Sequence, residues 1–255
     1  MIEGFLREVK VGDEPAGIAG AALSRRRPTP KALISPHAGY LFSGPIAASA
    51  YARLVPLRDT VRRVVVIGPS HYALFAGLAA TGAQAFATPL GAVPVDTAAI
   101  REICSRWPQV KVLEAAHARE HSLEVQLPFL QVVLADFKIV PLLAGDADDE
   151  EVAEVIESLW GGDETRFIIS SDLSHYHDYA AARELDAATA RAIEDLRPRD
   201  IGADQACGRL PIAGLLRAAR RHGLHAGILD VRNSGDTAGS RDQVVGYGAF
   251  IFEAA

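Results

Sequence analysis

The chain has 255 residues, of which 49% are hydrophobic and 23% charged, and its formal net charge is −6 at pH 7. A chain of this size can bury a hydrophobic core without disulfides, and its negative charge, spread with both signs along the sequence, argues against a nucleic-acid-binding surface. No run approaches the roughly 18 apolar residues needed to cross a bilayer, and the first ten residues do not resemble a signal peptide, so we expect a cytoplasmic protein.

The predicted elements alternate between strands and helices along the chain. In chain order they are strand 31–35, helix 45–54, strand 62–68, a hairpin excursion within 78–95, a helix with the stripe Leu123, Leu127, Leu130 and Leu134, strand 137–145, helix 151–160, strand 166–170, helices 181–197 and 211–222, and strand 244–252. The strands are almost continuously apolar, which indicates burial on both faces. The alternation predicts an α/β fold with a central mixed sheet flanked by helices. No linker divides the chain, so we expect one domain over residues 1–255.

The two cysteines are too few for a disulfide framework, and they differ in context. Cys104 recurs at helical spacing with Ile100, Ile103 and Trp107, which is typical of a residue that fills the core. Cys207 precedes a glycine and an apolar helix, and a helix N-terminus favours the thiolate. Cys207 is therefore the cysteine that we expect to take part in chemistry.

Three predicted strands run into histidines. His37 follows strand 31–35, His71 follows strand 62–68, and Asp172 and His175 follow strand 166–170. In open α/β sheets, ligands bind outside the carboxyl ends of the strands. These side chains could form one metal or acid–base site, or they could be unrelated loop and buried imidazoles. The pattern alone leaves both interpretations open.

A fourth segment carries His121 and Glu124, which are three residues apart and should share a face at the start of a helix. His121 could orient a metal ligand as a second-sphere partner, or it could be a capping residue. The helix dipole would favour Glu124 in the first turn in any case.

These segments together resemble the Memo family, whose bacterial and archaeal members are often described beside a radical-SAM protein. The matching segments appear in the family's order and are Ser35–Tyr40, Gly68–His71, Glu120–Glu124, Ser170–His175 and Cys207–Ile212. Each motif is weak alone, but the set is specific and spans most of the chain.

The resemblance implies a fold akin to class III extradiol dioxygenases, with metal ligands at His37, His71 and Cys207. Asp172 and His175 would lie beside them, with His175 as the acid–base residue. A cysteine would replace the carboxylate of the usual iron-binding facial triad, which makes the ligand set softer. A divalent metal is therefore expected, with Fe(II) or copper favoured and zinc also compatible. Ring cleavage does not follow from the fold, because thiolate itself is oxidisable.

Three further side chains lie close in sequence to the expected ligands. Tyr40 and Ser70 could donate hydrogen bonds to a substrate, although loop packing would explain them equally well. Arg209 could stabilise the Cys207 thiolate or hold an anionic substrate, or it could be a surface residue of the first helical turn.

Three functions remain open. The first is a metal-dependent, dioxygenase-like oxidoreductase acting on an unknown small molecule, or on a modified RNA or protein. The second is a binding or scaffold protein that recognises a peptide or partner protein in the same pocket. The third is a metal-independent hydrolase that uses Cys207 with His175 or His37. The resemblance suggests a radical-SAM protein and an AMMECR-like protein as partners.

Overall fold

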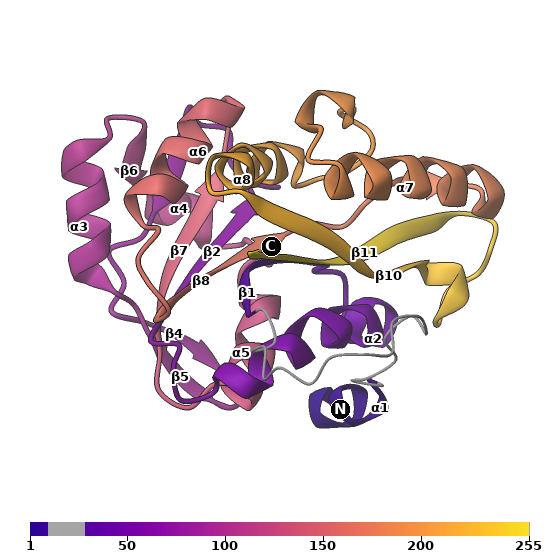
Figure 1. Cartoon of the computed structure of the whole chain (residues 1–255), viewed down its shortest axis with the longest axis horizontal. Helices are drawn as coiled ribbons and strands as arrows, with labels where there is room; N and C mark the ends of the chain where they lie inside the picture. The colour runs from indigo at the N-terminus through magenta and orange to yellow at the C-terminus, as the bar shows by residue number, and fades with distance from the viewer. Residues whose placement is uncertain (10–28, 255) are drawn as a thin grey trace, which may run out of the picture.

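The computed structural model describes residues 1–9 and 29–254, and a mixed β-sheet lies at its centre (Figure 1). Its strands are β1 (Pro30–Ser35), β2 (Arg63–Pro69), β3 (Leu78–Ala80), β6 (Val110–Val112), β7 (Lys138–Ala144), β8 (Thr165–Ser170), β9 (His175–His177), β10 (Leu224–Asn233) and β11 (Val244–Ala254). The strand order is β10-β11-β1-β8-β2-β7-β3-β6, and β9 pairs with β11. A separate hairpin joins β4 (Ala85–Thr88) to β5 (Gly91–Pro94).

The four inner strands β1, β8, β2 and β7 are parallel, whereas β11 and β3 continue the sheet in the antiparallel direction. The inner strands are buried along nearly their whole length, and Val64 to Ile67 of β2 have no exposed surface. Burial on both faces explains why these segments are continuously apolar. Parallel strands also bring their carboxyl ends to the same edge of the sheet.

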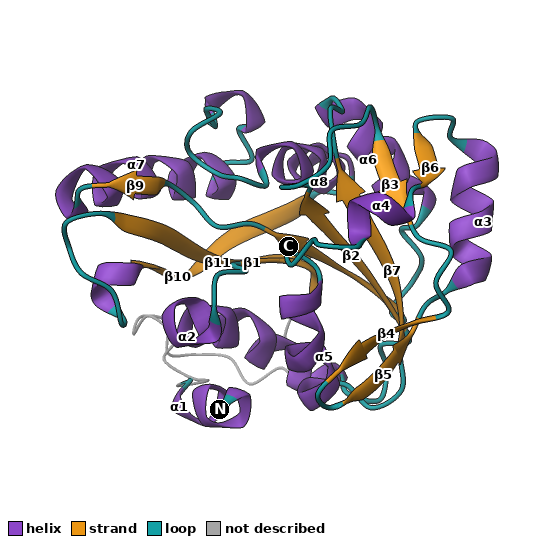
Figure 2. Cartoon of the chain, turned by 180° about the vertical axis from the view of Figure 1, so that it is seen from behind, coloured by secondary structure: helices purple, strands orange, loops and turns teal. Residues whose placement is uncertain are grey.

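Helices cover both faces of the sheet (Figures 1 and 2). On one face lie α2 (Tyr40–Tyr51), α5 (Leu127–Val133) and, outside α2, α1 (Ile2–Glu8); on the other lie α6 (Asp149–Ser158), α7 (Tyr179–Glu194) and α8 (Arg209–Arg221). The helices α3 (Thr97–Arg106) and α4 (Glu114–His117) accompany the β3–β6 end. This arrangement confirms the predicted fold class, a single α/β domain with a mixed central sheet flanked by helices. Within the described residues, every helix is too short or too polar to span a bilayer.

Most predicted elements are present, with boundaries shifted by a few residues. The predicted strands correspond to β1, β2, β7, β8 and β11, the stripe of four leucines is buried, and β4–β5 is the hairpin within 78–95. Helix α2 begins at Tyr40, five residues earlier than predicted, and contains Pro45. Pro45 is the sixth residue of α2 and has no amide to donate to the Leu41 carbonyl, one turn earlier.

One strand was missed, and one prediction about local structure was wrong. Strand β10 was not predicted, because this edge strand mixes polar and apolar residues and is stabilised by pairing with β11. His121 and Glu124 do not share a helical face. Pro128 lies in the first turn of α5, which therefore begins at Leu127, and only a short 3-10 turn, η2 (Glu124–Gln126), precedes it.

Candidate metal site

The site lies at the carboxyl edge of the three adjacent strands β1, β8 and β2. His37, Asp172 and His71 each stand two residues after the end of their strand. Because β8 lies between β1 and β2, parallel pairing brings the three turns together at one edge. The structure therefore brings these three residues to one edge of the sheet, a location that the sequence pattern had left open.

Three potential metal ligands meet at this edge. One side-chain donor atom from each of His37, His71 and Cys207 lies within 4.8 Å of the others. The Cys207 Sγ atom is 3.4 Å from His37 Nε2, and the centroids of the two imidazole rings are 5.3 Å apart. These donors come from segments up to 170 residues apart in the chain. The structure thus contains a possible metal-binding group with two nitrogen donors and one sulfur donor.

Cys207 reaches the site through a close approach of the loop that precedes α8 to the end of β8. The Gly208 amide donates to Ser171 Oγ at 2.9 Å. A Cβ atom at Gly208 would lie 2.6 Å from the Cβ of Ser171 and 2.8 Å from the carbonyl oxygen of Ser170. Only glycine therefore allows this approach, which explains the glycine next to the cysteine.

A buried hydrogen-bond network determines which nitrogen of His37 carries the proton. Gln126 Nε2 donates to the Pro36 carbonyl and to Ser170 Oγ, and the Ser170 hydroxyl donates its one proton to the Ser122 carbonyl. Ser170 Oγ can therefore only accept from His37 Nδ1, which lies 2.9 Å away. The proton of His37 thus resides on Nδ1, and the lone pair of Nε2 faces Cys207.

His71 is oriented by a carboxylate instead. Its Nδ1 atom lies 2.9 Å from Glu120 Oε1, and its backbone amide donates to Glu120 Oε2 at 2.6 Å. Glu120 Oε1 also accepts from the amides of His121 and Ser122 at 2.9 Å each, and the side chain of Glu120 is only 1% exposed. This hydrogen bond places the His71 proton on Nδ1 and leaves Nε2 free, as in carboxylate–histidine–metal triads.

The pKa values of these groups follow from burial and hydrogen bonding. Burial opposes ionisation of Glu120, but its hydrogen bonds from His71 and Ser122 outweigh this effect and lower the pKa to about 2. Burial lowers the pKa of His37 to about 4, although Asp172 opposes this shift. Burial, followed by the charge of Asp172, raises the pKa of the Cys207 thiol to about 12. The Gly208 amide at the N-terminus of α8 does lower this pKa, as the sequence suggested, but burial outweighs it.

Asp172 anchors the loop that carries His37. Its Oδ1 atom accepts from the backbone amides of His37 at 2.8 Å and Ala38 at 3.2 Å. Its Oδ2 atom lies 4.0 Å from His37 Nε2, and the residue is 4% exposed. Asp172 therefore holds the first ligand in place and presents one further oxygen to the same space.

His121 lies on the solvent side of the site. Its ring stacks on His71 with a centroid distance of 5.0 Å and meets the edge of His37 at 5.6 Å. Its side chain is 41% exposed, and its Nδ1 atom is 3.5 Å from Glu120 Oε1. His71, Glu120 and His121 also form a second group whose donor atoms lie within 4.8 Å of one another. The position of His121 beside the rings of His37 and His71 thus favours a role in the site over a role as a capping residue.

The other predicted residues lie around the site rather than in the donor cluster. His175 begins β9, and no hydrogen bond or ion pair joins its side chain to the cluster among the described residues. Tyr40 donates to the Val125 carbonyl at 3.0 Å, and Ser70 donates to the Ala73 carbonyl at 2.8 Å. Both hydroxyls thus already support loops.

Glu124 and Arg209 are also outside the donor cluster. Glu124 is exposed and lines, together with Tyr40, an apolar cavity of about 600 Å³ between α1, α5 and the β4–β5 hairpin. Arg209 is the first residue of α8, and its guanidinium makes no hydrogen bond or ion pair with another described residue. Neither position tests the substrate-binding roles that the sequence suggested.

Sequence reasoning did not assign roles to Glu120, Ser170 and Gln126, although all three are buried and orient the histidines. Glu120 stands beside His121 in the sequence, but 49 residues separate it from His71. No spacing rule connects residues so far apart. Their roles become visible only when the loops meet in the folded chain.

The fold and the site together define an α/β protein with a two-histidine, one-cysteine group at the carboxyl edge of its sheet. Residues 16–251 match the family model described as Memo-like protein. The chain is 35% identical to a MEMO1 family protein of Aquifex aeolicus (strain VF5) over 234 residues, which cover 88% of this chain and 86% of the relative. It is 38% identical to a MEMO1 family protein of Archaeoglobus fulgidus, over 87% of this chain and 86% of the relative. The chain belongs to the Memo family.

Among solved structures, the fold is similar to that of an uncharacterized protein from Escherichia coli K12. The TM-score is 0.55 at 16% sequence identity, and the match covers 87% of this chain and 99% of the other. At this identity the similarity concerns the fold alone.

Proposed function

We propose that this chain binds one divalent metal ion through His37, His71 and Cys207 and acts as a metal-dependent oxidoreductase. The observation that carries this proposal is the arrangement of protons. Both imidazoles donate from Nδ1, to Ser170 and Glu120 respectively, so both can present the Nε2 lone pair to a metal ion, and His37 Nε2 already lies 3.4 Å from the Cys207 sulfur. Such preset tautomers are what a histidine-ligated metal requires.

The donor set bears on the choice of metal. Two imidazoles and a thiolate suit copper, iron or zinc better than Mg²⁺ or Ca²⁺, which prefer oxygen ligands. We favour Fe(II) or copper over zinc. A redox-active ion in this position would supply an electron-transfer couple and an open coordination position for a small ligand.

The surrounding side chains bind, orient and move protons. Asp172 holds the His37 amide and keeps Oδ2 within 4.0 Å of His37 Nε2, so this oxygen can accept a proton or add a ligand atom. His121 faces solvent beside His71 and can exchange a proton between its ring and a bound molecule. His175 remains the proposed acid–base residue of the β9 loop. Arg209 remains a proposed partner for an anionic substrate.

A binding function is the second candidate, because apolar side chains are exposed next to the site. Tyr72 is 56% exposed and its ring centroid lies 6.3 Å from that of His121, while Leu74 in the same loop is fully exposed. Arg119 lies over the Tyr72 ring at 5.0 Å. Such a rim suits a peptide or a partner protein. A radical-SAM protein and an AMMECR-like protein remain the proposed partners.

The hydrolase alternative is less well supported. Cys207 and His37 are in contact, but burial shifts the pKa values of both toward their neutral forms. A nucleophilic Cys–His pair requires the thiolate. A metal-independent hydrolase activity would have to persist after complete chelation.

Metal analysis tests the proposal. We expect about one metal ion per chain in anaerobically purified wild type after loading with Fe(II), copper or zinc. His37→Ala and Cys207→Ala should lose most of this metal, whereas His225→Ala, at an exposed position on β10, should retain it. A wild type without metal under all three conditions would contradict the proposed site, and full occupancy in both site variants would contradict the ligand assignment.

Oxygen consumption by the loaded protein with a reductant then separates the two functions. Metal-dependent consumption that His37→Ala abolishes supports the oxidoreductase. Stoichiometric metal without consumption, together with partner binding that survives in the His37→Ala, Cys207→Ala double variant, supports the binding function.

A further inference from the structure

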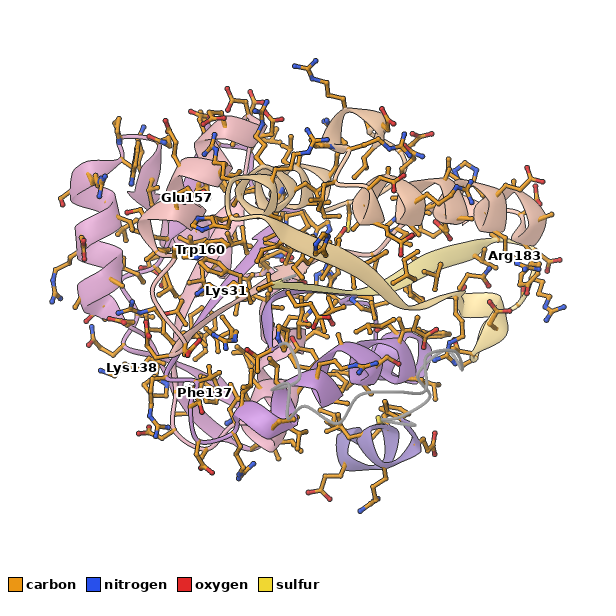
Figure 3. The ribbon with its side chains drawn as sticks, viewed as in Figure 1. Lys31, Phe137, Lys138, Glu157, Trp160 and Arg183 are labelled. Carbon is orange, nitrogen blue, oxygen red and sulfur yellow. The ribbon has the colours of Figure 1, made fainter. Side chains whose placement is uncertain are left out.

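The opposite edge of the same sheet carries two buried or half-buried cations. Lys31 is the second residue of β1 and Arg166 is the second residue of β8, so they lie side by side at the amino ends of adjacent parallel strands. Four residues of each strand separate them from the metal edge, about 13 Å at the usual rise of a strand. Lys31 lies close to Trp160 on the face shown in Figure 3. This region is therefore distinct from the metal site.

The hydrogen bonds of Lys31 and Arg166 secure the turn that precedes β8. Lys31 Nζ donates to the carbonyls of Trp160, Gly162 and Thr165 at 2.5, 3.0 and 3.1 Å. Arg166 Nη1 donates to the carbonyls of Asp163 and Thr165 at 3.0 and 2.8 Å. These contacts provide acceptors for the ammonium group of Lys31 and for the Nη1 atom of the Arg166 guanidinium.

The turn does not provide a hydrogen-bond acceptor for the other edge of the Arg166 guanidinium, which is formed by Nε and Nη2. Arg166 is only 3% exposed, yet its Nε atom is buried and has no hydrogen-bond partner among the described residues, and Nη2 likewise makes no hydrogen bond with them. The Nε–Nη2 edge is one that carboxylates and phosphates engage with two parallel hydrogen bonds. Leaving a buried donor without an acceptor is unfavourable, so an occupant is expected there.

Charge and space favour an anion. Among the described residues, neither Lys31 nor Arg166 has a carboxylate within ion-pair distance, and their mutual repulsion contributes, after burial, to lowering the pKa of Lys31 to about 8. The nearest acids, Asp163 and Glu164, belong to the turn itself, and Glu164 faces the Gly162 amide and the Thr165 hydroxyl instead. Both cations line a hollow of about 290 Å³ that is also bordered by Trp160, His222 and Asp163.

Besides Lys31 and Arg166, the titratable groups that line the hollow are His222 and Asp163. His222 stacks on Trp160 with a centroid distance of 3.7 Å and pairs with Glu157 at 2.7 Å. The imidazole is thereby directed to Glu157 rather than to the guanidinium. Asp163 brings one negative charge that acts on both cations, so Lys31 and Arg166 together leave the hollow with a net positive charge.

We propose that this hollow binds a small oxyanion, the phosphate or carboxylate group of a ligand, through the Nε–Nη2 edge of Arg166 with Lys31 supplying charge beside it. The site lies beyond the proposed metal function and does not depend on it. Since β1 and β8 also carry His37 and Asp172 at their other ends, a ligand here would contact the same two strands that support the metal site.

NMR spectroscopy of the ¹⁵N-labelled protein tests this site in the wild type. The Arg166 Nε–Hε resonance, assigned by its disappearance in Arg166→Lys, is followed during titration with inorganic phosphate, acetate or chloride at matched ionic strength. We expect a saturable shift with phosphate or acetate and none with chloride, and the anion that saturates identifies the class of ligand. Shifts that are no larger with either oxyanion than with chloride would overturn the proposal.

Variants give a second measurement. Arg166→Lys keeps the charge but lacks the planar fork, so the same anion, followed by the Trp160 indole resonance, should bind about tenfold more weakly. Lys31→Gln keeps an amide donor for the turn carbonyls and should also weaken binding. Arg63→Lys is the matched control, because Arg63 begins the neighbouring strand β2 but is already paired with Asp96 at 2.9 Å. Equal binding by Arg166→Lys and Arg63→Lys would refute the assignment to Arg166.

Discussion

The two histidines of the candidate metal site are oriented in the same way by opposite environments. His37 is 2% exposed and donates to Ser170, a neutral hydroxyl in a fully hydrogen-bonded network. His71 has a side chain that is 29% exposed and donates to Glu120, an ionised carboxylate. The neutral side, His37 with Ser170, fixes the orientation of the imidazole without adding charge. The carboxylate side, His71 with Glu120, also makes the imidazole a stronger donor to a metal ion. The site therefore combines one buried ligand held by a neutral hydroxyl with one more exposed ligand held by a carboxylate.

The largest expected effect is on the carboxylate side. Glu120→Gln should lower metal affinity about 10- to 100-fold, because His71 loses its anionic partner. It should also lower the free energy of unfolding by about 3 kcal/mol, the value that corresponds to a pKa lowered from 4.5 to about 2. Chelator competition and urea denaturation measure the two quantities. Glu114→Gln, which removes a carboxylate that accepts the Gly82 amide away from the site, should leave metal affinity unchanged.

The neutral side should make the metal-free protein sensitive to acid. The folded-state pKa of His37 is about 4, whereas its ordinary value is 6.5, so between these values the unfolded chain binds a proton that the folded chain does not. Stability should therefore fall as the pH is lowered from 6.5 to 4, by up to about 3 kcal/mol from His37. Urea denaturation across this range should show a shallower pH dependence in His37→Gln than in wild type. Parallel curves for the two proteins would contradict the buried, neutral assignment of His37.

Ser170→Ala tests the neutral network directly and should have a smaller effect on metal than Glu120→Gln. It leaves His37 Nδ1 and one proton of Gln126 without an acceptor, which should cost about 1–3 kcal/mol of stability. Metal affinity should fall about tenfold, since the lost partner carries no charge. Ser105→Ala, at an exposed serine of α3, provides the control for both measurements. If Ser170→Ala weakened metal more than Glu120→Gln, the contrast between the two sides would be wrong.

The smallest effect is expected at Tyr40. Tyr40→Phe removes the hydrogen bond to the Val125 carbonyl and should cost about 1 kcal/mol, with metal affinity unchanged. Thermal unfolding and the chelator assay measure these outcomes. A loss of metal in this variant would place Tyr40 within the site rather than in the support of its loop.

Much of the fold and part of the site were predictable from local sequence patterns. Continuous apolar runs revealed β1, β2, β7, β8 and β11, because residues buried on both faces must all be apolar. The same runs located His37 and His71 at strand ends. Edge strand β10 escaped prediction, since its stability comes from its neighbour and leaves little trace in its own residues.

The sequence by itself determined the family, the α/β class and the candidate ligands His37, His71 and Cys207. Only the tertiary structure decided that β8 lies between β1 and β2 and that Glu120 and Ser170 hold the Nδ1 protons of the two histidines. It alone also showed that the Nε atom of Arg166, at the opposite end of the sheet, has no hydrogen-bond partner among the described residues. The physical reason is the range of the interactions. Periodicity reports how neighbours along the chain are buried, whereas strand order and proton positions depend on contacts between segments that meet only after folding.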